Sequence, residues 1–334
     1  MPVKKISAIS FIALLTLGSL TLVYGWGGWG HKHINRSAIF ALPAEMRIFY
    51  YDHIDFITEG SVVPDLRRAL LNDKAEPARH YIDIEDFKAP VEALPRTVKE
   101  AYAKYDSAFL QKSGYLPWYI QSLMDRLTLA FTRKNKSEIL FLSAELGHYM
   151  GDAHVPLHTS SNHDGQLTNQ KGIHSLWESR LAQTFGETYN FNTGEAKYVD
   201  DIVSETWRII KQSYMAADTV LAAEKKLRAN FPKDELYKKD SVGKPMLRFN
   251  QPVLSDAYVS KFNTDLNDMV QRQMRSAATD LANFWFTAWA NGGKPDLTDM
   301  DDPAFVRHNR KNYKREWKAW QRGRLLNLQV KEQE

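Results

Sequence analysis

Residues 147–158 read Gly-His-Tyr-Met-Gly-Asp-Ala-His-Val-Pro-Leu-His and hold the first of two matching pairs, His148 and Asp152. Side chains four residues apart lie on one face of a helix, with Cβ atoms about 5–6 Å apart. One imidazole and one carboxylate can therefore converge on a single cation. Histidine and carboxylate side chains are common zinc ligands, so we expect a helical metal-binding segment that ends near Pro156, with His158 just beyond it.

The second pair, His174 and Glu178, repeats this spacing sixteen residues after His158. A single such pair is also common on a helix surface or at an N-cap. Two pairs with a further histidine between them, all within residues 148–178, favour a centre with more than one metal ion. The sequence contains no HExxH motif, which argues against a standard zinc protease.

The chain has 334 residues and no cysteine, which excludes disulfide bonds and thiolate zinc sites. Any metal must be held by His, Asp, Glu or the chain terminus. A chain of this length buries roughly 75% of its unfolded surface and can build a large core without covalent links.

Residues 1–25 have the pattern of a secretory signal peptide. Lys4 and Lys5 precede an apolar run from Ile9 to Val23, and Gly25 supplies a small residue for cleavage. A membrane span is the alternative, but it would need about 20 strongly apolar residues. We predict cleavage before Trp26, a secreted or periplasmic mature chain, and no membrane span elsewhere.

The charge is unevenly distributed. The whole chain carries a net charge of +4, and residues 306–334 alone contain nine Lys/Arg and three Asp/Glu. The predicted catalytic body, residues 26–305, is therefore net negative. A basic tail can contact phosphate or anionic lipid, although a solvated or frayed helix end has the same composition.

Apolar periodicity predicts a single all-α domain. The expected helices span 97–112, 117–133, 137–153, 172–185, 199–228 and 256–291, and Ser137 is the expected N-cap of the third. Residues 159–171 are predicted to form a loop, residues 78–87 a short extended segment, and residues 229–255 a polar excursion. The sequence contains no repeat and no low-complexity segment.

Two further clusters carry ligand-type residues. Residues 26–31 read Trp-Gly-Gly-Trp-Gly-His, and a free α-amine with a pKa of about 7.7–8.0 binds zinc near neutral pH. The same residues could instead be only an export junction. Asp65 and His80 are candidates to complete the shell of another ion, and Arg68 could neutralise a phosphate, although each alone also fits a surface charge or turn.

Taken in order, these clusters resemble the superfamily of zinc-dependent phospholipases C and single-strand nucleases of the S-one and P-one type. The pattern is Trp-Gly-x-x-Gly-His, then Pro-Asp, His-aromatic-x-Asp, His-x3-Asp-x5-His and His-x3-Glu, and it runs from Trp26 to Glu178. The resemblance implies one mostly helical domain with three zinc ions in a cleft, which hydrolyses phosphate esters with metal-activated water.

The resemblance also implies the ligands of each zinc ion. The first would be held by Asp65, His80, His148 and Asp152, the second by His158, His174 and Glu178, and the third by the amine and carbonyl of Trp26 with His31 and a bridging Asp152. Asp65 would also orient or deprotonate the attacking water, with Arg68 as a phosphate clamp and Tyr81 and Asp83 as substrate-binding residues. It gives no role to His33, His53, His154, His163 or His308.

The two branches of the superfamily differ in substrate. Glu178, the short 158–174 segment and the lack of a Gly-Gly-Asn segment favour the phospholipase C branch. Tyr81 and Asp83 also fit a nuclease, in which they would stack on a base and hydrogen-bond to it, whereas Tyr81 could equally bind a choline head group by a cation–π contact. Phospholipid is the preferred substrate, single-stranded nucleic acid the alternative, and no obligate protein partner is inferred.

A non-catalytic, exported zinc-binding protein is the competing class. Structural zinc sites are normally closed by four protein ligands, whereas catalytic sites keep a position for water. The expected ligand sets leave such positions, which favours an enzyme.

Overall fold

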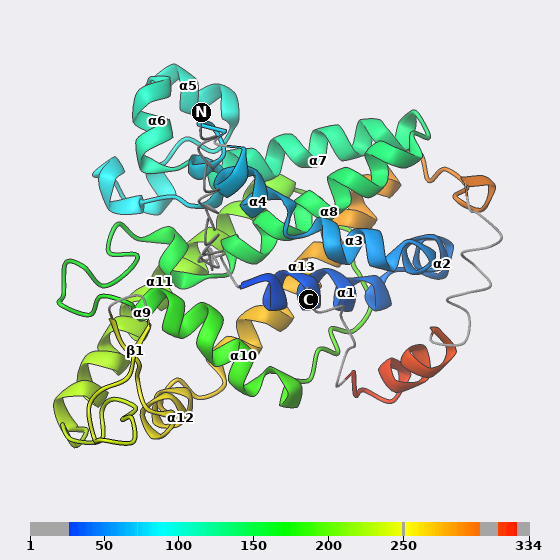
Figure 1. The fold of residues 1–334 in the computed structure, drawn as a ribbon. Helices are drawn as coiled ribbons and strands as arrows, with labels where there is room; N and C mark the ends of the chain where they lie inside the picture. Colours follow the sequence, from blue (N-terminus) through cyan, green and yellow to red (C-terminus); the bar gives the residue numbers. More distant parts are fainter. Residues whose placement is uncertain (1–26, 72, 249–250, 301–312, 326–334) are drawn as a thin grey trace, which may run out of the picture.

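A bundle of helices surrounds the central helix α8 (Lys136–Ala153) in the computed structural model, which describes residues 27–71, 73–248, 251–300 and 313–325. Helices α1, α3, α7 and α13 all pack against α8 (Figure 1). The predicted class, a single mostly helical domain, is confirmed.

The bounds of the elements are as follows. The other α-helices are α1 (Gly27–Ala41), α2 (Ala44–Asp52), α3 (Ile54–Gly60), α4 (Val63–Leu70), α5 (Val98–Lys104), α6 (Ser107–Ser113), α7 (Leu116–Thr132), α9 (Ile173–Ser175), α10 (Leu181–Phe185), α11 (Ile202–Asn230), α12 (Asp256–Asp265) and α13 (Met269–Asn291). Short 3-10 turns are η1 (Pro77–His80), η2 (Ile84–Phe87), η3 (Val91–Ala93), η4 (Pro156–Thr159), η6 (Gly186–Thr188) and η7 (Thr298–Met300), and η5 (Leu176–Arg180) is a π-helix. Strands β1 (Leu247–Arg248) and β2 (Gln251–Pro252) form an antiparallel hairpin.

Helix α8 begins one residue earlier than expected, and its cap is not Ser137. The side chain of Asn135 accepts a hydrogen bond from the backbone N–H of Glu138 at 3.3 Å and caps the helix. The prediction of Ser137 is therefore wrong by two residues, although asparagine is as good an N-cap as serine. The helix ends at Ala153, before Pro156, and η4 then carries His158, as expected.

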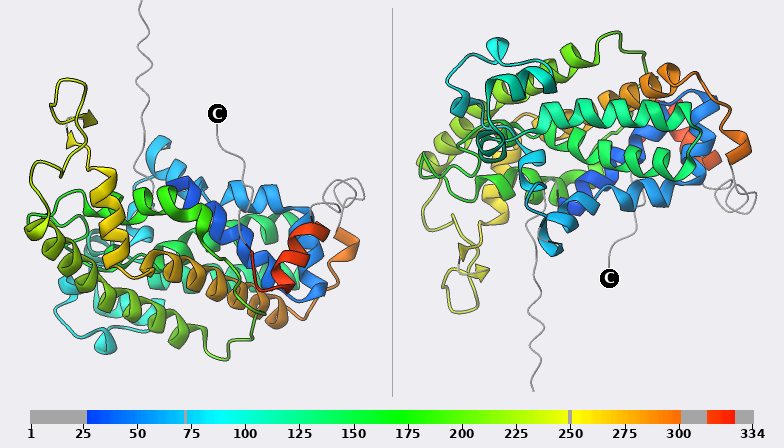
Figure 2. Two further views of the ribbon diagram at one scale, coloured as in Figure 1. Left: turned by 90° about the horizontal axis from the view of Figure 1, so that it is seen from below. Right: turned by 90° about the horizontal axis from the view of Figure 1, so that it is seen from above.

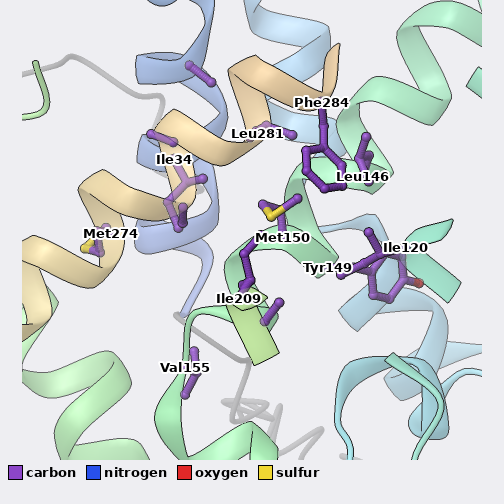
Figure 3. Packing of buried hydrophobic residues seen from close by; sticks show 14 of the residues in the cluster. Ile34, Ile120, Leu146, Tyr149, Met150, Val155, Ile209, Met274, Leu281 and Phe284 are labelled. Carbon is purple, nitrogen blue, oxygen red and sulfur yellow. The ribbon is translucent and has the colours of Figure 1, made fainter. Parts of the chain in front are cut away.

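Every residue from Leu142 to Ala153 is buried, so this part of α8 faces protein on all sides. Leu146 and Met150 lie near Phe284 and Leu281 of α13 in Figure 3. Asn35 of α1 fixes a close approach, because its Nδ2 donates to the backbone oxygens of Ala144 at 3.2 Å and Ile57 at 3.0 Å. The core therefore holds the metal-binding segment on a rigid helix.

Two predicted helices are each divided in two. The 256–291 stretch breaks between α12 and α13, where Asn267 and Asp268 adopt positive φ values of 48° and 57°. The 97–112 stretch breaks at Asp106, which caps α6 by accepting a hydrogen bond from the N–H of Phe109. An apolar stripe persists across both breaks, so periodicity alone does not reveal them.

The segments between the long helices were predicted with mixed success. The prediction of an extended segment at 78–87 is wrong for most of it, because η1 and η2 occupy both ends and Ile82 alone forms a β-bridge, with Gly114. Residues 159–171 form turns, and the excursion at 229–255 carries β1 and β2. Helices α1 to α4 were not predicted.

The described part of the basic tail packs on the body rather than extending from it. Residues 313–321 are helical and lie at the end of the molecule opposite the hairpin (Figure 2). Glu316 pairs with Arg36 of α1 at 3.1 Å and accepts a hydrogen bond from the hydroxyl of Tyr51 at 2.9 Å. The guanidinium of Arg47 lies 3.4 Å from the ring centroid of Trp317.

The predictions about export and membrane spans concern residues at and beyond the start of the described chain. The predicted signal peptide and Trp26 lie outside the described residues. Among the described helices, none is both long and apolar enough to cross a bilayer.

Gly147→Ala tests the close approach of α1 to α8. A Cβ at Gly147 would lie 1.9 Å from Oδ1 of the buried Asn35. We expect a loss of about 1–3 kcal/mol in the free energy of unfolding, the usual cost of overpacking, measured by denaturant unfolding. The matched control is Gly28→Ala, because a Cβ there would meet Val62 at an ordinary 3.6 Å. Equal stability of the two variants would show that Asn35 is not held as described.

Candidate metal centre

Three groups of potential metal ligands converge at one end of α8. Within each group the ligand atoms lie within 4.8 Å of one another, and every residue is buried except His174, which is partly exposed. The groups are His31, Asp65 and His148; His80, His148 and Asp152; and His158, His174 and Glu178. Seven elements supply them, so segments far apart in the sequence meet here.

The first cluster consists of His148 and Asp152 at the end of α8, His80 at the end of η1 and Asp65 of α4. Nδ1 of His80 lies 3.0 Å from Oδ2 of Asp152 and 3.8 Å from Oδ1 of Asp65. Nε2 of His148 lies 3.3 Å from Oδ2 of Asp152 and 3.0 Å from Nδ1 of His80. The structure therefore brings together all four residues predicted to hold the first ion.

Asp152 presents its two oxygens to different neighbours. Oδ2 faces His80 and His148, whereas Oδ1 lies 3.6 Å from Nε2 of His31. His31 also stacks on His148, with ring centroids 4.0 Å apart. A carboxylate in this position can bridge two cations, which is the role that the sequence predicts for it.

The remaining cluster lies between η4 and η5. Oε2 of Glu178 is 2.6 Å from Nε2 of His174 and 3.6 Å from Nε2 of His158, and the two imidazole nitrogens are 3.2 Å apart. Glu178 lies in the π-helical turn, a distortion that often marks functional sites. The His174–Glu178 contact predicted from the spacing forms despite this distortion.

Backbone carbonyls orient three of the candidate histidine ligands. Nδ1 of His148 lies 2.7 Å from the oxygen of Ser61, Nδ1 of His158 lies 2.6 Å from that of His80, and Nδ1 of His174 lies 3.0 Å from that of His163. A carbonyl only accepts a hydrogen bond, so each Nδ1 carries the proton. In the neutral form of each imidazole, the lone pair of Nε2 is directed into the centre.

The donor atoms are buried without the partners that buried polar groups normally have. Among the described residues, both nitrogens of His31, both oxygens of Asp65 and Glu178, and Oδ1 of Asp152 lack a hydrogen-bond partner. Burying carboxylates in this way is costly unless opposite charge compensates them. Nitrogen and oxygen donors without sulfur suit zinc, so the residues present fit the zinc centre predicted from the sequence.

The electrostatics support ionised carboxylates. Burial alone would raise the pKa of Asp152, but the charges of His148 and His158 hold it well below its usual value. In the same way, burial is outweighed by the charges of His174 and His158, which lower the pKa of Glu178 to about 2. Burial lowers the pKa of His31 well below its usual range, so this imidazole is neutral and able to bind a cation.

Asp65 and Arg68 lie together on α4. Nη2 of Arg68 is 3.2 Å from Oδ1 of Asp65, and about a third of the arginine side chain is exposed. Burial raises the pKa of Asp65, opposed by the charges of His148 and His80. The predicted catalytic pair is thus adjacent to the first cluster, with the guanidinium on its solvent side.

Tyr81 and Asp83 flank a segment that is tied to the centre. The N–H of Ile82 donates to the oxygen of His158 at 2.9 Å, and the hydroxyl of Tyr81 donates to the oxygen of Lys112 at 2.8 Å. Burial, together with Asp86 and Glu85, raises the pKa of Asp83 to about 7. Both predicted substrate-binding residues are partly exposed beside the metal ligands.

Gly27, the first described residue, lies beside the element that carries Glu178. The Cβ position of Gly27 lies 3.5 Å from Oγ of Ser179, the residue after Glu178, and 3.5 Å from Nε2 of Gln183. The chain therefore enters α1 beside the element that carries Glu178.

Of the histidines without a predicted role, His154 has a structural one. Its Nε2 lies 3.0 Å from Asp280 and its Nδ1 lies 2.8 Å from the oxygen of Met150, outside the three groups. His308 lies outside the described residues.

Glu76 also belongs to the surroundings of the site, although it was not predicted from the sequence. It stands four residues before His80 and contacts it at 3.4 Å. The i, i+4 spacing that identified the other pairs is present here as well.

The chain is similar, at a distance, to one nuclease of known type. No family model matches the chain. Nuclease S1 from Aspergillus oryzae is 21% identical over 209 residues, which span 58% of this chain and 67% of the relative.

Asp152→Asn and His174→Ala separate a bridging ligand from a terminal one. Asp152 faces two groups and His174 one, so we expect Asp152→Asn to lose two metal ions per chain and His174→Ala one, against three in the wild type. Elemental analysis after dialysis measures this content. His154→Gln is the control on α8's C-terminal end and should retain all metal. Full metal content in Asp152→Asn would disprove the bridging role.

Proposed function

Because distant homology places the chain in the superfamily of zinc-dependent phospholipases C and single-strand nucleases, we propose that it is a zinc-dependent phosphodiesterase of the nuclease type. The observation that carries this proposal is the convergence of three histidine–carboxylate groups, in which both nitrogens of His31 and both oxygens of Asp65 and Glu178 have no hydrogen-bond partner among the described residues. The relative supports the nuclease alternative over the phospholipase preference that Glu178 and the short 158–174 segment suggested.

The chemistry follows from the donor set. Zinc bound there would lower the pKa of a coordinated water toward 7 and stabilise negative charge on the phosphate oxygens. Asp65, which pairs with Arg68 through Oδ1 and has a pKa raised by burial, accepts a proton from the attacking water or orients it. Arg68, adjacent and partly exposed, binds a phosphate oxygen of the substrate.

We assign the substrate contacts to residues 81–83, which follow His80 and are hydrogen-bonded to His158. The ring of Tyr81, anchored through its hydroxyl, would stack on a base, and Asp83 would hydrogen-bond to that base. The hydrogen bond from Ile82 to His158 keeps Tyr81 and Asp83 at a fixed distance from the metal ligands. A base bound there would hold the adjoining phosphate in position for hydrolysis.

We further propose export, with residues 1–25 removed as a signal peptide. Cleavage before Trp26 would free the α-amine, which with the carbonyl of Trp26 and His31 would hold the third ion. The position of Gly27 beside Ser179 supports this geometry.

A protein that begins at Trp26 is compared with one that carries two extra residues before it. A peptide nitrogen has no available lone pair, so the extended protein should contain one metal ion fewer and hydrolyse single-stranded DNA more slowly. Metal analysis and rate are measured on the same samples. Equal metal content and equal rates would remove the α-amine from the site.

Tyr81→Ala tests the substrate class. Loss of base stacking, worth about 1–3 kcal/mol, should weaken binding and cleavage of single-stranded DNA at unchanged zinc content. Tyr81→Phe is the matched control, because it keeps the ring and loses only the hydroxyl contact with Lys112. All three proteins are assayed on single-stranded DNA and on phosphatidylcholine micelles, with and without chelator.

The outcomes distinguish the branches. Chelator-sensitive DNA cleavage that falls in Tyr81→Ala and persists in Tyr81→Phe supports the nuclease. Faster cleavage of phosphatidylcholine than of DNA by the wild type would reinstate the phospholipase. Zinc-loaded protein that cleaves neither substrate would favour a non-catalytic zinc-binding protein.

A further inference from the structure

One histidine of the centre is oriented differently from the others. His148, His158 and His174 use Nδ1 to bond a backbone oxygen and present Nε2 to the centre. His80 is reversed: its Nδ1 faces Asp152 and His148, and its outer nitrogen is Nε2. That nitrogen meets a carboxylate, Oε1 of Glu76, at 3.4 Å.

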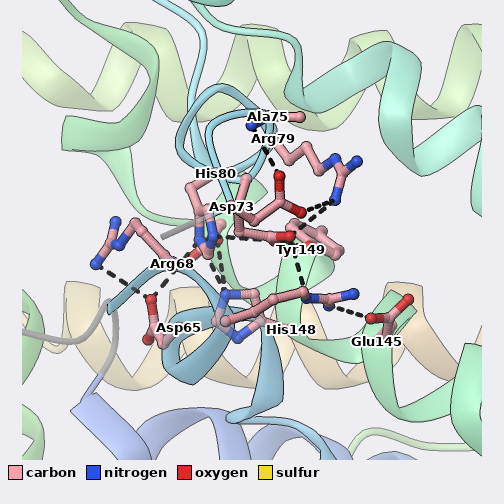
Figure 4. A network of polar contacts seen from close by, with 12 residues as sticks. Asp65, Arg68, Asp73, Ala75, Arg79, His80, Glu145, His148 and Tyr149 are labelled. Carbon is pink, nitrogen blue, oxygen red and sulfur yellow. Dashed lines mark hydrogen bonds and ion pairs between the residues drawn. The ribbon is translucent and has the colours of Figure 1, made fainter. Parts of the chain in front are cut away.

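Glu76 is fully buried, and other side chains fix both of its oxygens. The hydroxyl of Tyr149 donates to Oε1, the oxygen that faces His80. Oε2 lies 3.1 Å from Nε of Arg67 and 2.8 Å from Nη1 of Arg79. Figure 4 labels Arg79, Tyr149 and Glu145 of this network beside His80 and His148.

The carboxylate is ionised in this setting. The guanidinium groups of Arg67 and Arg79, 3.1 Å and 2.8 Å from Oε2, compensate the negative charge of Glu76. Glu145, also buried, holds the other end of the Arg67 guanidinium. Two arginines and two glutamates are thus placed behind a single imidazole, an arrangement that is costly to desolvate and that a core of apolar residues would not need.

The geometry points to Glu76 as the positioning residue for His80: its carboxylate accepts the Nε2 proton and leaves the lone pair of Nδ1 directed at the cation shared with Asp152 and His148. A neutral imidazole carries its proton on one nitrogen only, so the outer partner selects the nitrogen that binds metal. A carboxylate also increases the basicity of the ligating nitrogen more than a carbonyl does. This inference rests on the zinc centre of the proposed function and not on its substrate.

Glu76→Gln and Glu145→Gln separate positioning from a structural role. Both remove one buried negative charge next to Arg67, but only Glu76 contacts His80. We expect Glu76→Gln to weaken one of the zinc ions about 10- to 100-fold and Glu145→Gln to leave all zinc affinities unchanged. Affinities are measured by competition with a chromogenic chelator, and the unfolding temperature of each protein is recorded alongside.

Nitrogen-15 NMR of histidine-labelled, zinc-loaded protein reports which ring nitrogen of His80 binds metal and which carries the proton. A change in packing alone would not exchange the two. The wild type should show a ring with metal on Nδ1 and a slowly exchanging proton on Nε2. In Glu76→Gln that proton should exchange faster and its signal should shift, whereas in Glu145→Gln it should not.

Tyr149→Phe keeps the proposal testable should Glu76→Gln not fold. It removes the hydrogen bond to Oε1 while Arg67 and Arg79 still hold the carboxylate, so we expect a smaller loss of affinity for the same zinc ion. Where both variants fold, their effects should not add, because they act through one oxygen.

Three results would overturn the proposal. They are unchanged zinc affinity in Glu76→Gln, equal losses in Glu76→Gln and Glu145→Gln, and a wild-type His80 that binds metal through Nε2. Wild-type protein that binds no zinc would overturn both this inference and the proposed function. Normal zinc binding with no phosphodiesterase activity would overturn the proposed function alone.

Discussion

The burial of three carboxylates, Asp65, Asp152 and Glu178, around one end of α8 is the constraint on which the site depends. Each is at most 1% exposed, and a buried anion must be matched by positive charge. The groups that face Asp152 and Glu178 are imidazoles, which become cationic only by taking up protons. Bound cations would satisfy the carboxylates and leave the histidines neutral, so the arrangement favours metal over protonated histidine at neutral pH.

Helix α8 joins this site to the core. Leu146 and Met150 pack toward α13, while His148 and Asp152, on the same stretch, face the ligands from α4, η1 and α1. Asn35 holds α1 against α8 and thereby also sets the position of His31, four residues earlier on α1. The positions of His31, His148 and Asp152 are therefore fixed by core packing.

The sequence predicted the class of the fold and the residues that meet at the site, because ligand spacing and apolar periodicity are local properties. It did not predict the breaks at Asp106 and Asn267, where capping and positive φ interrupt an apolar stripe that continues on both sides. Helices α1 to α4 were also missed, and three of them are short, with nine, seven and eight residues in α2, α3 and α4. Their packing against α8 and one another is a tertiary effect, and short helices gain little from intrinsic propensity.

Glu76 shows why ligands are easier to predict than the groups behind them. The Glu76–His80 spacing equals that of His174–Glu178, yet one glutamate faces the centre and the other stands behind its histidine. The difference lies in which ring nitrogen faces inward, and the backbone oxygens of Ser61, His80 and His163 decide it for the other histidines. No carbonyl is described behind His80, and a carboxylate held by two arginines occupies that position. Spacing thus identifies a pair, whereas the surrounding fold decides whether its acid binds the cation or orients the base.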